Sequence, residues 1–368
     1  MAIYLGNLKV NMMAGTTEGG GSGVTVEPLS VTSNGTYSAP TGTAYSPVTV
    51  SVPTLSASTI TLTENGVYSA PTGYAYSPVT VSVSGGGSAD YLETRAAMTS
   101  YSSTASSIQA YAFACISSLT AVSLPNITSV PSGAFMSCSK LETINASGIK
   151  SIYSSAFYYC DKLAYASFPE CTYLGYTAFT NCSSMSYASF PKYSGSLSGF
   201  SYCYKLEDFY APSTTSTYTY CFYNCSKLSS VDITSCHTLS TYTFYNCSSL
   251  SEIDLPHLYR PIGSQAFYSC RALHTVKIGS SVTSTSTSHI IYPSAFLYCV
   301  NLLSLYLYGS QMWTLSNINV FSSTPISTYT TSTGGVNGSI FVPASLVDTY
   351  KSATNWATYS ARITSIPA

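Results

Sequence analysis

The sequence predicts a mainly β solenoid of nine coils with short helical or turn segments, preceded by two small all-β repeat modules. The first observation is a phenylalanine that recurs at separations of 22, 22, 22, 21, 22, 22, 23 and 29 residues. The second is the alternating apolar and polar segment that follows each one, the pattern of a half-buried strand. Each coil buries its apolar face only against its neighbours, so repetition itself makes the core. The nine residues are Phe113, Phe135, Phe157, Phe179, Phe200, Phe222, Phe244, Phe267 and Phe296.

Composition excludes several classes of protein. Only 7% of the 368 residues are charged, against about 25% in an ordinary globular domain, and the net charge is −1. The basic footprint of a nucleic-acid-binding protein is therefore absent. No run of 18 apolar residues occurs, so membrane insertion is not expected either. Ser, Thr and 34 tyrosines replace charged residues on the surface, which suits a protein inside an assembly or outside a cell.

An attachment segment and a linker open the chain. Residues 1–14 are expected to be an amino-terminal attachment segment with a strand through Ile3–Val10. They show no apolar run of secretory length and no small-residue cleavage site, so no signal peptide is predicted. Residues 15–23, GTTEGGGSG, are a Gly-rich linker.

Residues 24–83 contain two tandem β modules, at 31–52 and 62–83. The copies match at 18 of 22 positions, and each has an Asn-Gly turn signal and an alternating apolar run. A module of this size is too small to be stable alone. The modules are therefore expected to pair with each other or with copies in other chains, which predicts a homo-oligomer. A Gly/Ser linker at 84–88 follows.

The solenoid is predicted over residues 89–309. Asp90–Ser100 is a helix candidate that would cap its amino-terminal end. Apolar or small residues follow each phenylalanine at positions six, nine and eleven, so successive strands should form a parallel sheet with about 4.7–4.9 Å between neighbours. Residues 310–368 leave the period and are expected to form a carboxy-terminal cap. That cap should contain a strand at Ile340–Val342 and a helix at Ala344–Ala353.

Eight of the 12 cysteines share one repeat position, three residues after a phenylalanine. A small apolar residue type that recurs at the same position of successive repeats is typical of the core, so these cysteines are expected to be free, buried thiols. Disulfides are the alternative, and zinc is not expected because no CxxC pair occurs. The eight are Cys138, Cys160, Cys182, Cys203, Cys225, Cys247, Cys270 and Cys299.

The repeat strings AFMSCSKLETI, AFYYCDKLAYASFP, TFYNCSSLSEIDLP and AFYSCRALHTVKI resemble the leucine-rich repeats of BspA-like bacterial surface proteins. The tail GSIFVPASLVDTYKSATNWATYSARI is similar to the closing module of that family, so the resemblance covers residues 89–368. It implies a leucine-rich-repeat solenoid used for adhesion or recognition, and it provides no catalytic residues to carry over.

Residues 1–83 resemble the amino-terminal parts of phage and prophage tail or fibre proteins of gut bacteria. The similar strings are MAIYLGNLKV and the NGxYSAPTGxAYSPVTVSV repeats. This resemblance implies that residues 1–83 attach to other virion proteins and that the solenoid serves host recognition. No secretion signal or cell-wall sorting tail is recognised, which favours a virion location. The alternative is a bacterial cell-surface adhesin or structural scaffold.

Side chains eight and ten residues after each phenylalanine should point away from the core, because they alternate with the buried positions. On this face tyrosines lie together, with acidic residues beside them. Rigid tyrosines among small polar residues are also typical of antibody paratopes. The face is a candidate binding site for a host surface glycan or protein; alternatively, a Ser/Tyr ladder merely covers the sheet. The candidates are Tyr165, Tyr187, Tyr210, Asp208, Asp232, Glu252 and Asp254.

No catalytic or metal site is predicted. The four histidines fall at different repeat offsets, and the Gly-rich stretch lies between modules, so neither an enzyme nor a cofactor is expected. Asp232 and Asp254 should stack in adjacent coils, where a bound cation could relieve their repulsion. The ninth phenylalanine comes late because of extra residues within 280–292, which are either a tolerated insertion or a recognition loop.

Overall fold

The computed structural model of the protein describes residues 97–279, 281, 289–327 and 337–367 in full. Before residue 97 it describes only eight strands, by their bounds and pairing. The predicted linkers at 15–23 and 84–88 lie outside the described residues.

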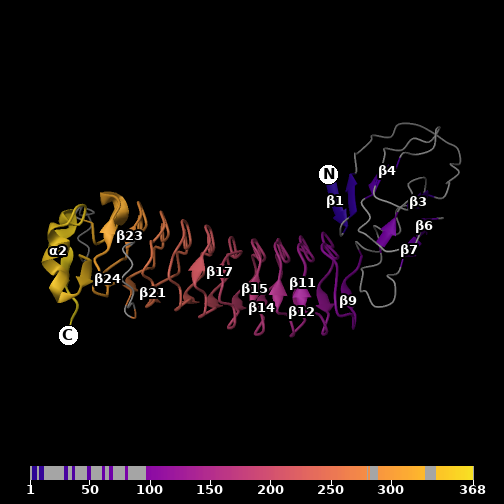
Figure 1. Ribbon diagram of the computed structural model, residues 1–368, viewed down its shortest axis with the longest axis horizontal. Coiled ribbons are helices and arrows are strands. Elements are labelled where there is room, and N and C mark those ends of the chain that lie inside the picture. Colours follow the sequence, from indigo (N-terminus) through magenta and orange to yellow (C-terminus); the bar gives the residue numbers. More distant parts are fainter. Residues whose placement is uncertain are drawn as a thin grey trace.

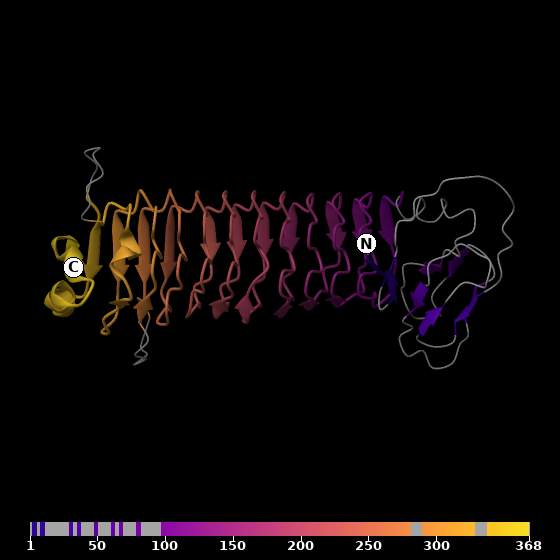
Figure 2. The same cartoon turned by 90° about the horizontal axis from the view of Figure 1, so that it is seen from above.

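The described coils stack in a row, and each contributes one strand to a long parallel column (Figures 1 and 2). Every strand pair in this column is parallel, in three hydrogen-bonded sheets. The prediction of a solenoid with a spacing of about 22 residues is confirmed. The sheets consist of β9 (Ser100–Ser102), β10 (Ala121–Ser123) and β12 (Thr143–Asn145); β14 (Tyr165–Ser167), β16 (Tyr187–Ser189), β18 (Asp208–Tyr210) and β20 (Ser230–Asp232); and β21 (Glu252–Leu255), β22 (Thr275–Ile278), β24 (Ser304–Leu307), β26 (Ser339–Val342) and β27 (Ile363–Ser365).

A second column of two-residue strands runs along the solenoid. These strands pair in parallel as well, so they join neighbouring coils at a second place. They are β11 (Ser129–Val130), β13 (Ser151–Ile152) and β15 (Tyr173–Leu174); β17 (Ser196–Leu197) and β19 (Ser216–Thr217); and β23 (Ile290–Ile291) and β25 (Thr314–Leu315).

The repeated phenylalanines form a continuous ladder of buried rings. Successive centroids lie 5.1–5.9 Å apart, with interplanar angles of at most 23°. The ladder continues into the cap, because Phe321 stacks on Phe296 at 5.5 Å. Aromatic pairs at this distance attract one another beyond the area they bury. The ladder is therefore the core that repetition was expected to create.

The repeated cysteines form a second ladder. All twelve cysteines are free thiols, and all except Cys115 are buried, which confirms the predicted burial of the column. Each column thiol donates a hydrogen bond of 2.9–3.2 Å to the carbonyl of the phenylalanine one coil earlier. A cysteine at this position thus fills a small space and also satisfies a buried carbonyl.

Both ends of the solenoid extend the sheet. The structure describes residues 97–100 of the helix predicted over Asp90–Ser100, and there the prediction is wrong. Ser100 begins strand β9, which pairs with β10. At the other end the predicted strand and helix are confirmed. After β25 come η1 (Ile318–Phe321), β26, η2 (Ala344–Leu346), α2 (Val347–Ser352), η3 (Ala357–Arg362) and β27.

Buried aromatic side chains fasten this cap to the last coils. The Trp356 indole N–H donates to the carbonyl of Trp313 at 2.7 Å. The Trp313 amide donates to the Tyr350 hydroxyl at 2.8 Å. The rings of Trp356 and Tyr359 also pack on Phe321, with centroids at 6.0 and 5.2 Å, so the cap covers the end of the phenylalanine ladder, as an open solenoid requires.

The eight strands before residue 97 all pair in antiparallel fashion. The single strand predicted over Ile3–Val10 is instead two, β1 (Ala2–Leu5) and β2 (Leu8–Asn11), paired with each other. The two modules contain equivalent hairpins with the same register, and they pair with each other through their first strands. These strands are β3 (Leu29–Val31), β4 (Gly35–Tyr37) and β5 (Val48–Val50), and β6 (Ile60–Leu62), β7 (Gly66–Tyr68) and β8 (Val79–Val81).

Cysteine alkylation should distinguish the exposed thiol from the buried ones. In the native protein at about pH 8, near the pKa of an ordinary thiol, iodoacetamide is expected to label Cys115 and few others. Burial raises the pKa of Cys171 to about 11 and that of Cys203 to about 12, so these thiols stay protonated as well as covered. Mass spectrometry after unfolding should then show all 12 labelled. Extensive native labelling of the column, or disulfides among its members, would contradict this arrangement.

Candidate functional site

The candidate face is built by strands whose middle residue is buried and whose flanking residues face solvent. In β14 and β18 the middle residues Ala166 and Phe209 are in the core. The predicted tyrosines are exposed: Tyr165 by 66%, Tyr187 by 36% and Tyr210 by 40%. Strand alternation therefore places these side chains as the sequence predicted.

Strand register brings five of the seven predicted residues onto one sheet. Tyr165 is the direct partner of Tyr187, which is in turn the partner of Asp208. Two residues further along the strands, Tyr210 is the partner of Asp232. Directly opposed side chains in a sheet lie close enough to interact. The site is thus a contiguous patch of three tyrosines and two carboxylates on rigid backbone.

The remaining two acidic residues lie on the next sheet. Glu252 and Asp254 belong to β21, which pairs with β22 and not with β20. The Asp232 carboxylate accepts a hydrogen bond from the Thr234 amide at 3.2 Å, and the strand partner of Asp254 is Lys277. The expected stacking of Asp232 on Asp254 is therefore absent from the strand pairing.

A cation site is not supported by the described residues. Among them, no group of three or more His, Cys, Asp or Glu side chains is arranged to hold a metal ion. Lys277 beside Asp254 also lowers the repulsion that a cation was expected to relieve.

Comparison with known families identifies the repeat. The family model described as BspA type leucine rich repeat region matches residues 95–198 and 196–302, more than half of the chain. The chain belongs to the BspA-type leucine-rich-repeat family. No curated protein matches it.

Solved structures of other leucine-rich-repeat proteins are similar to this BspA-type chain. One, from Bacteroides ovatus, is 21% identical with a TM-score of 0.44, over 82% of this chain and 92% of that one. A leucine-rich cell surface protein from Faecalibacterium prausnitzii is 19% identical with a TM-score of 0.34, over 61% and 81%. The leucine-rich-repeat protein of T. pallidum is 22% identical with a TM-score of 0.35, over 48% and 78%.

The BspA-type sheet carries a second aromatic group that the sequence did not single out. Tyr306 on β24 is the strand partner of Phe341 on β26, and their rings stack at 4.5 Å and 13°. Tyr308 lies 5.9 Å from Tyr306. Phe341 belongs to the cap, outside the repeat period, so its place on this face could not be counted from a phenylalanine. The candidate face therefore has aromatic groups on both sides of its acidic residues.

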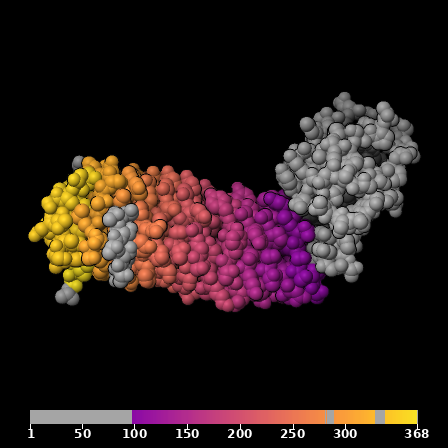
Figure 3. All heavy atoms as spheres, viewed as in Figure 1, coloured from indigo at the N-terminus to yellow at the C-terminus, as the bar shows by residue number. Residues whose placement is uncertain are grey.

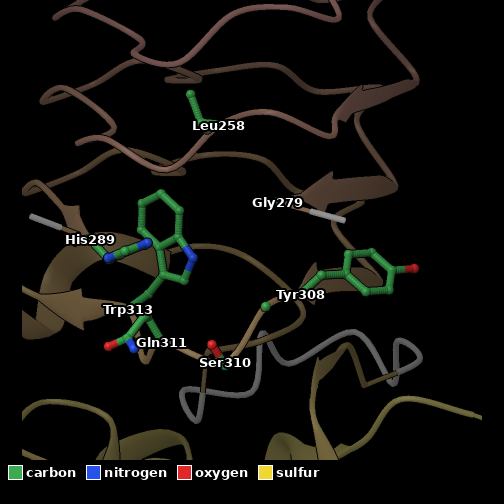
Figure 4. A pocket seen from close by; sticks show the side chains of 8 residues that line it. Leu258, Gly279, His289, Tyr308, Ser310, Gln311 and Trp313 are labelled. Atoms are coloured by element: carbon green, nitrogen blue, oxygen red, sulfur yellow. The ribbon is translucent and has the colours of Figure 1, made fainter. Parts of the chain in front are cut away.

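A shallow pocket lies beside the last coils of the BspA-type solenoid (Figure 4). Its lining includes Leu258, Tyr308, Gln311 and Trp313, and the buried His289 ring lies edge-on to the Trp313 indole at 5.2 Å. The described lining includes one imidazole, that of His289.

On the face shown in Figure 3 the described coils form a continuous surface from the amino-terminal to the carboxy-terminal end. Within the described part of the chain, no helix has the length and apolar character needed to cross a bilayer. The strand face is the candidate functional site because its register brings exposed tyrosines and carboxylates together.

Proposed function

We propose that this BspA-type protein is a non-enzymatic recognition protein whose solenoid binds a glycan or protein on a cell surface. The observation that carries the proposal is the register of Tyr165, Tyr187 and Asp208 on adjacent strands, with Tyr210 beside them. Tyrosine offers a large amphipathic contact area at a low cost in conformational entropy. Strands held in a stacked sheet also keep these side chains in place before binding, which lowers the cost of association.

The acidic residues give this face a defined polarity. Asp208 and Asp232 lie next to the tyrosines, and Glu252 and Asp254 continue the acidic strip on β21. Carboxylates accept hydrogen bonds from sugar hydroxyls and from peptide amides. A ligand that fits has apolar ring or side-chain surfaces next to hydrogen-bond donors. Polyanionic ligands are disfavoured by charge.

We further propose that residues 1–83 attach the protein to other virion proteins, so that the solenoid acts in host recognition by a phage. The support is the resemblance of these residues to tail and fibre proteins, together with their two equivalent hairpins. A bacterial cell-surface adhesin or scaffold is the alternative. Mass spectrometry of purified phage particles separates the two: the protein is expected in particles, and its recovery only from bacterial envelopes would support the alternative.

Replacing Tyr165, Tyr187 and Tyr210 together by Ala is expected to weaken binding at least about tenfold, because tyrosines dominate many interfaces. The measurement is binding of the labelled full chain to a panel of whole bacterial cells and to an array of bacterial surface glycans. The fold should be unchanged, because the three side chains are exposed.

A matched control uses exposed tyrosines on another part of the same coils. Tyr153, Tyr176 and Tyr218 follow strands of the second column and are similarly exposed. Their triple change to Ala removes the same chemistry and should leave binding within about twofold. If both triple variants bind like the parent, the strand face is not the binding site.

A further inference from the structure

The turns that carry the buried phenylalanines form an uncharged edge along the solenoid. In all nine coils, the seven residues from three before to three after the phenylalanine include no Asp, Glu, Lys, Arg or His. The charged residues begin just beyond, at positions such as Lys205 and Lys227, which are exposed. An uncharged edge of this length with a charged border is typical of an interaction surface.

Tyrosines from four successive coils join on this edge into one cluster. Tyr220 stacks on Tyr242 at 4.8 Å and 6°. In a parallel row, Tyr223, Tyr245 and Tyr268 stack at 4.7 and 4.5 Å. Edge-on contacts of 5.3–5.8 Å connect the two rows, and Tyr202 contacts Tyr223 at 5.4 Å. The tyrosine ridge, as we call it, consists of Tyr202, Tyr220, Tyr223, Tyr242, Tyr245 and Tyr268.

The fold does not require tyrosine at these positions. Tyr220 and Tyr242 have φ values of 64° and 59°, in the left-handed region that non-glycine residues seldom adopt. At the same position in earlier coils, Ser155 and Thr177 have φ values of 57°. Where Tyr223 and Tyr245 lie, coil four has Thr180. Serine and threonine thus form the same turn in other coils, so neither the turn nor core packing requires the large side chains of the ridge.

The ridge is chemically self-complementary. Tyrosine phenols are uncharged at neutral pH, and burial, followed by the charges of neighbouring tyrosines, raises the pKa of Tyr223 and of Tyr245 further. A phenol both donates and accepts a hydrogen bond. Two copies of such a surface can therefore satisfy one another without any charged pair, and the net charge of −1 opposes association little.

We infer that the tyrosine ridge is an interface between two copies of this chain. A partner that meets the ridge over several coils must repeat at the 4.5–4.8 Å spacing of its rings, and the ridge of a second solenoid has that spacing. A two-fold arrangement buries the same patch on both chains and closes the assembly as a dimer. Sugars are a poorer fit, because the ring faces on which they would stack are already covered by neighbouring rings.

The test compares self-association of the full chain and of a fourfold variant, Tyr220→Thr, Tyr223→Thr, Tyr242→Thr and Tyr245→Thr. Threonine already occupies both turn positions in coil four, so the fold should be preserved, as circular dichroism and the unfolding midpoint would show. Sedimentation velocity up to about 100 μM covers the micromolar range of weak interfaces. The variant is expected to raise the dissociation constant at least about tenfold.

The matched control is the triple change of Tyr165, Tyr187 and Tyr210 to Thr, which should leave self-association unchanged. Dityrosine cross-linking of the parent, mapped by mass spectrometry, should join ridge tyrosines of two chains. This second measurement separates the ridge from association through residues 1–83. A monomeric parent, a folded fourfold variant that associates like the parent, or association without ridge cross-links would each overturn the inference. Soluble glycans that protect the ridge of a monomeric parent would instead make it a ligand site.

Discussion

Replacing Phe157 by Ala is expected to lower the free energy of unfolding by about 3–5 kcal/mol, the usual range for a fully buried phenylalanine. Phe157 is completely buried and lies between Phe135 and Phe179, with ring centroids at 5.3 and 5.1 Å. Its amide also donates to the carbonyl of Ala178 at 2.8 Å, one of the bonds that fix the spacing of the coils. Because that spacing is fixed, the neighbouring rings cannot close the cavity, and the loss should lie high in the range.

Urea unfolding followed by circular dichroism, with hydrogen exchange resolved by coil, measures this loss. Resolution by coil matters because repeat proteins can unfold in parts. The control is Tyr165→Ala, eight residues away in the same coil, where the side chain is 66% exposed and the change should be within about 0.5 kcal/mol. A loss below about 1 kcal/mol for Phe157→Ala would show that the ring is not part of the core.

Gly263→Ala is expected to destabilise the protein by about 2–3 kcal/mol, at the upper end of the usual cost of overpacking. A Cβ at this position would lie 2.3 Å from the Thr241 amide nitrogen and 2.4 Å from the Ser240 carbonyl carbon. Both are backbone atoms of the preceding coil, so relief requires the two coils to move apart. Gly263 is the residue that lets the chain pass this close.

The matched control is Gly148→Ala, where the nearest atom to a new Cβ is the Ile127 carbonyl oxygen at 3.6 Å. That distance is ordinary contact, so the change should be neutral or slightly stabilising, because alanine restricts the unfolded chain more than glycine does. Thermal unfolding of the two variants side by side gives the comparison. Equal unfolding midpoints for the two variants would mean that the coils at Gly263 lie far enough apart to admit a methyl group.

The features of the fold that could be predicted from sequence are those that the period repeats. The sequence placed Phe157 and Cys160 in the core because the same residue types recur at the same positions of neighbouring coils. Equivalent residues of stacked coils pack on one another, so each buries the next. The outward direction of Tyr165 followed from strand alternation alone. Repetition makes one local pattern sufficient for many positions.

Features outside the period could not be predicted in this way. Ser100 belongs to a strand because pairing with β10 overrides the helical composition of the preceding residues. Phe321 joins the ladder 25 residues after Phe296 without the repeat cysteine that marks eight of the nine repeat coils. The left-handed turns at Tyr220 and Tyr242 have no glycine to signal them. The contact of Tyr306 with Phe341 depends on how the cap folds back.

The uniform spacing of the phenylalanine ladder has a consequence for inheritance. Every pair of neighbouring coils meets through nearly the same contact, so a gene can gain or lose one repeat unit and the joined coils still meet through that contact. Each such event would change the length of the solenoid by about 4.8 Å, and would bring different exposed tyrosines side by side. Reach and surface pattern can therefore vary between descendants by recombination alone, without new core residues.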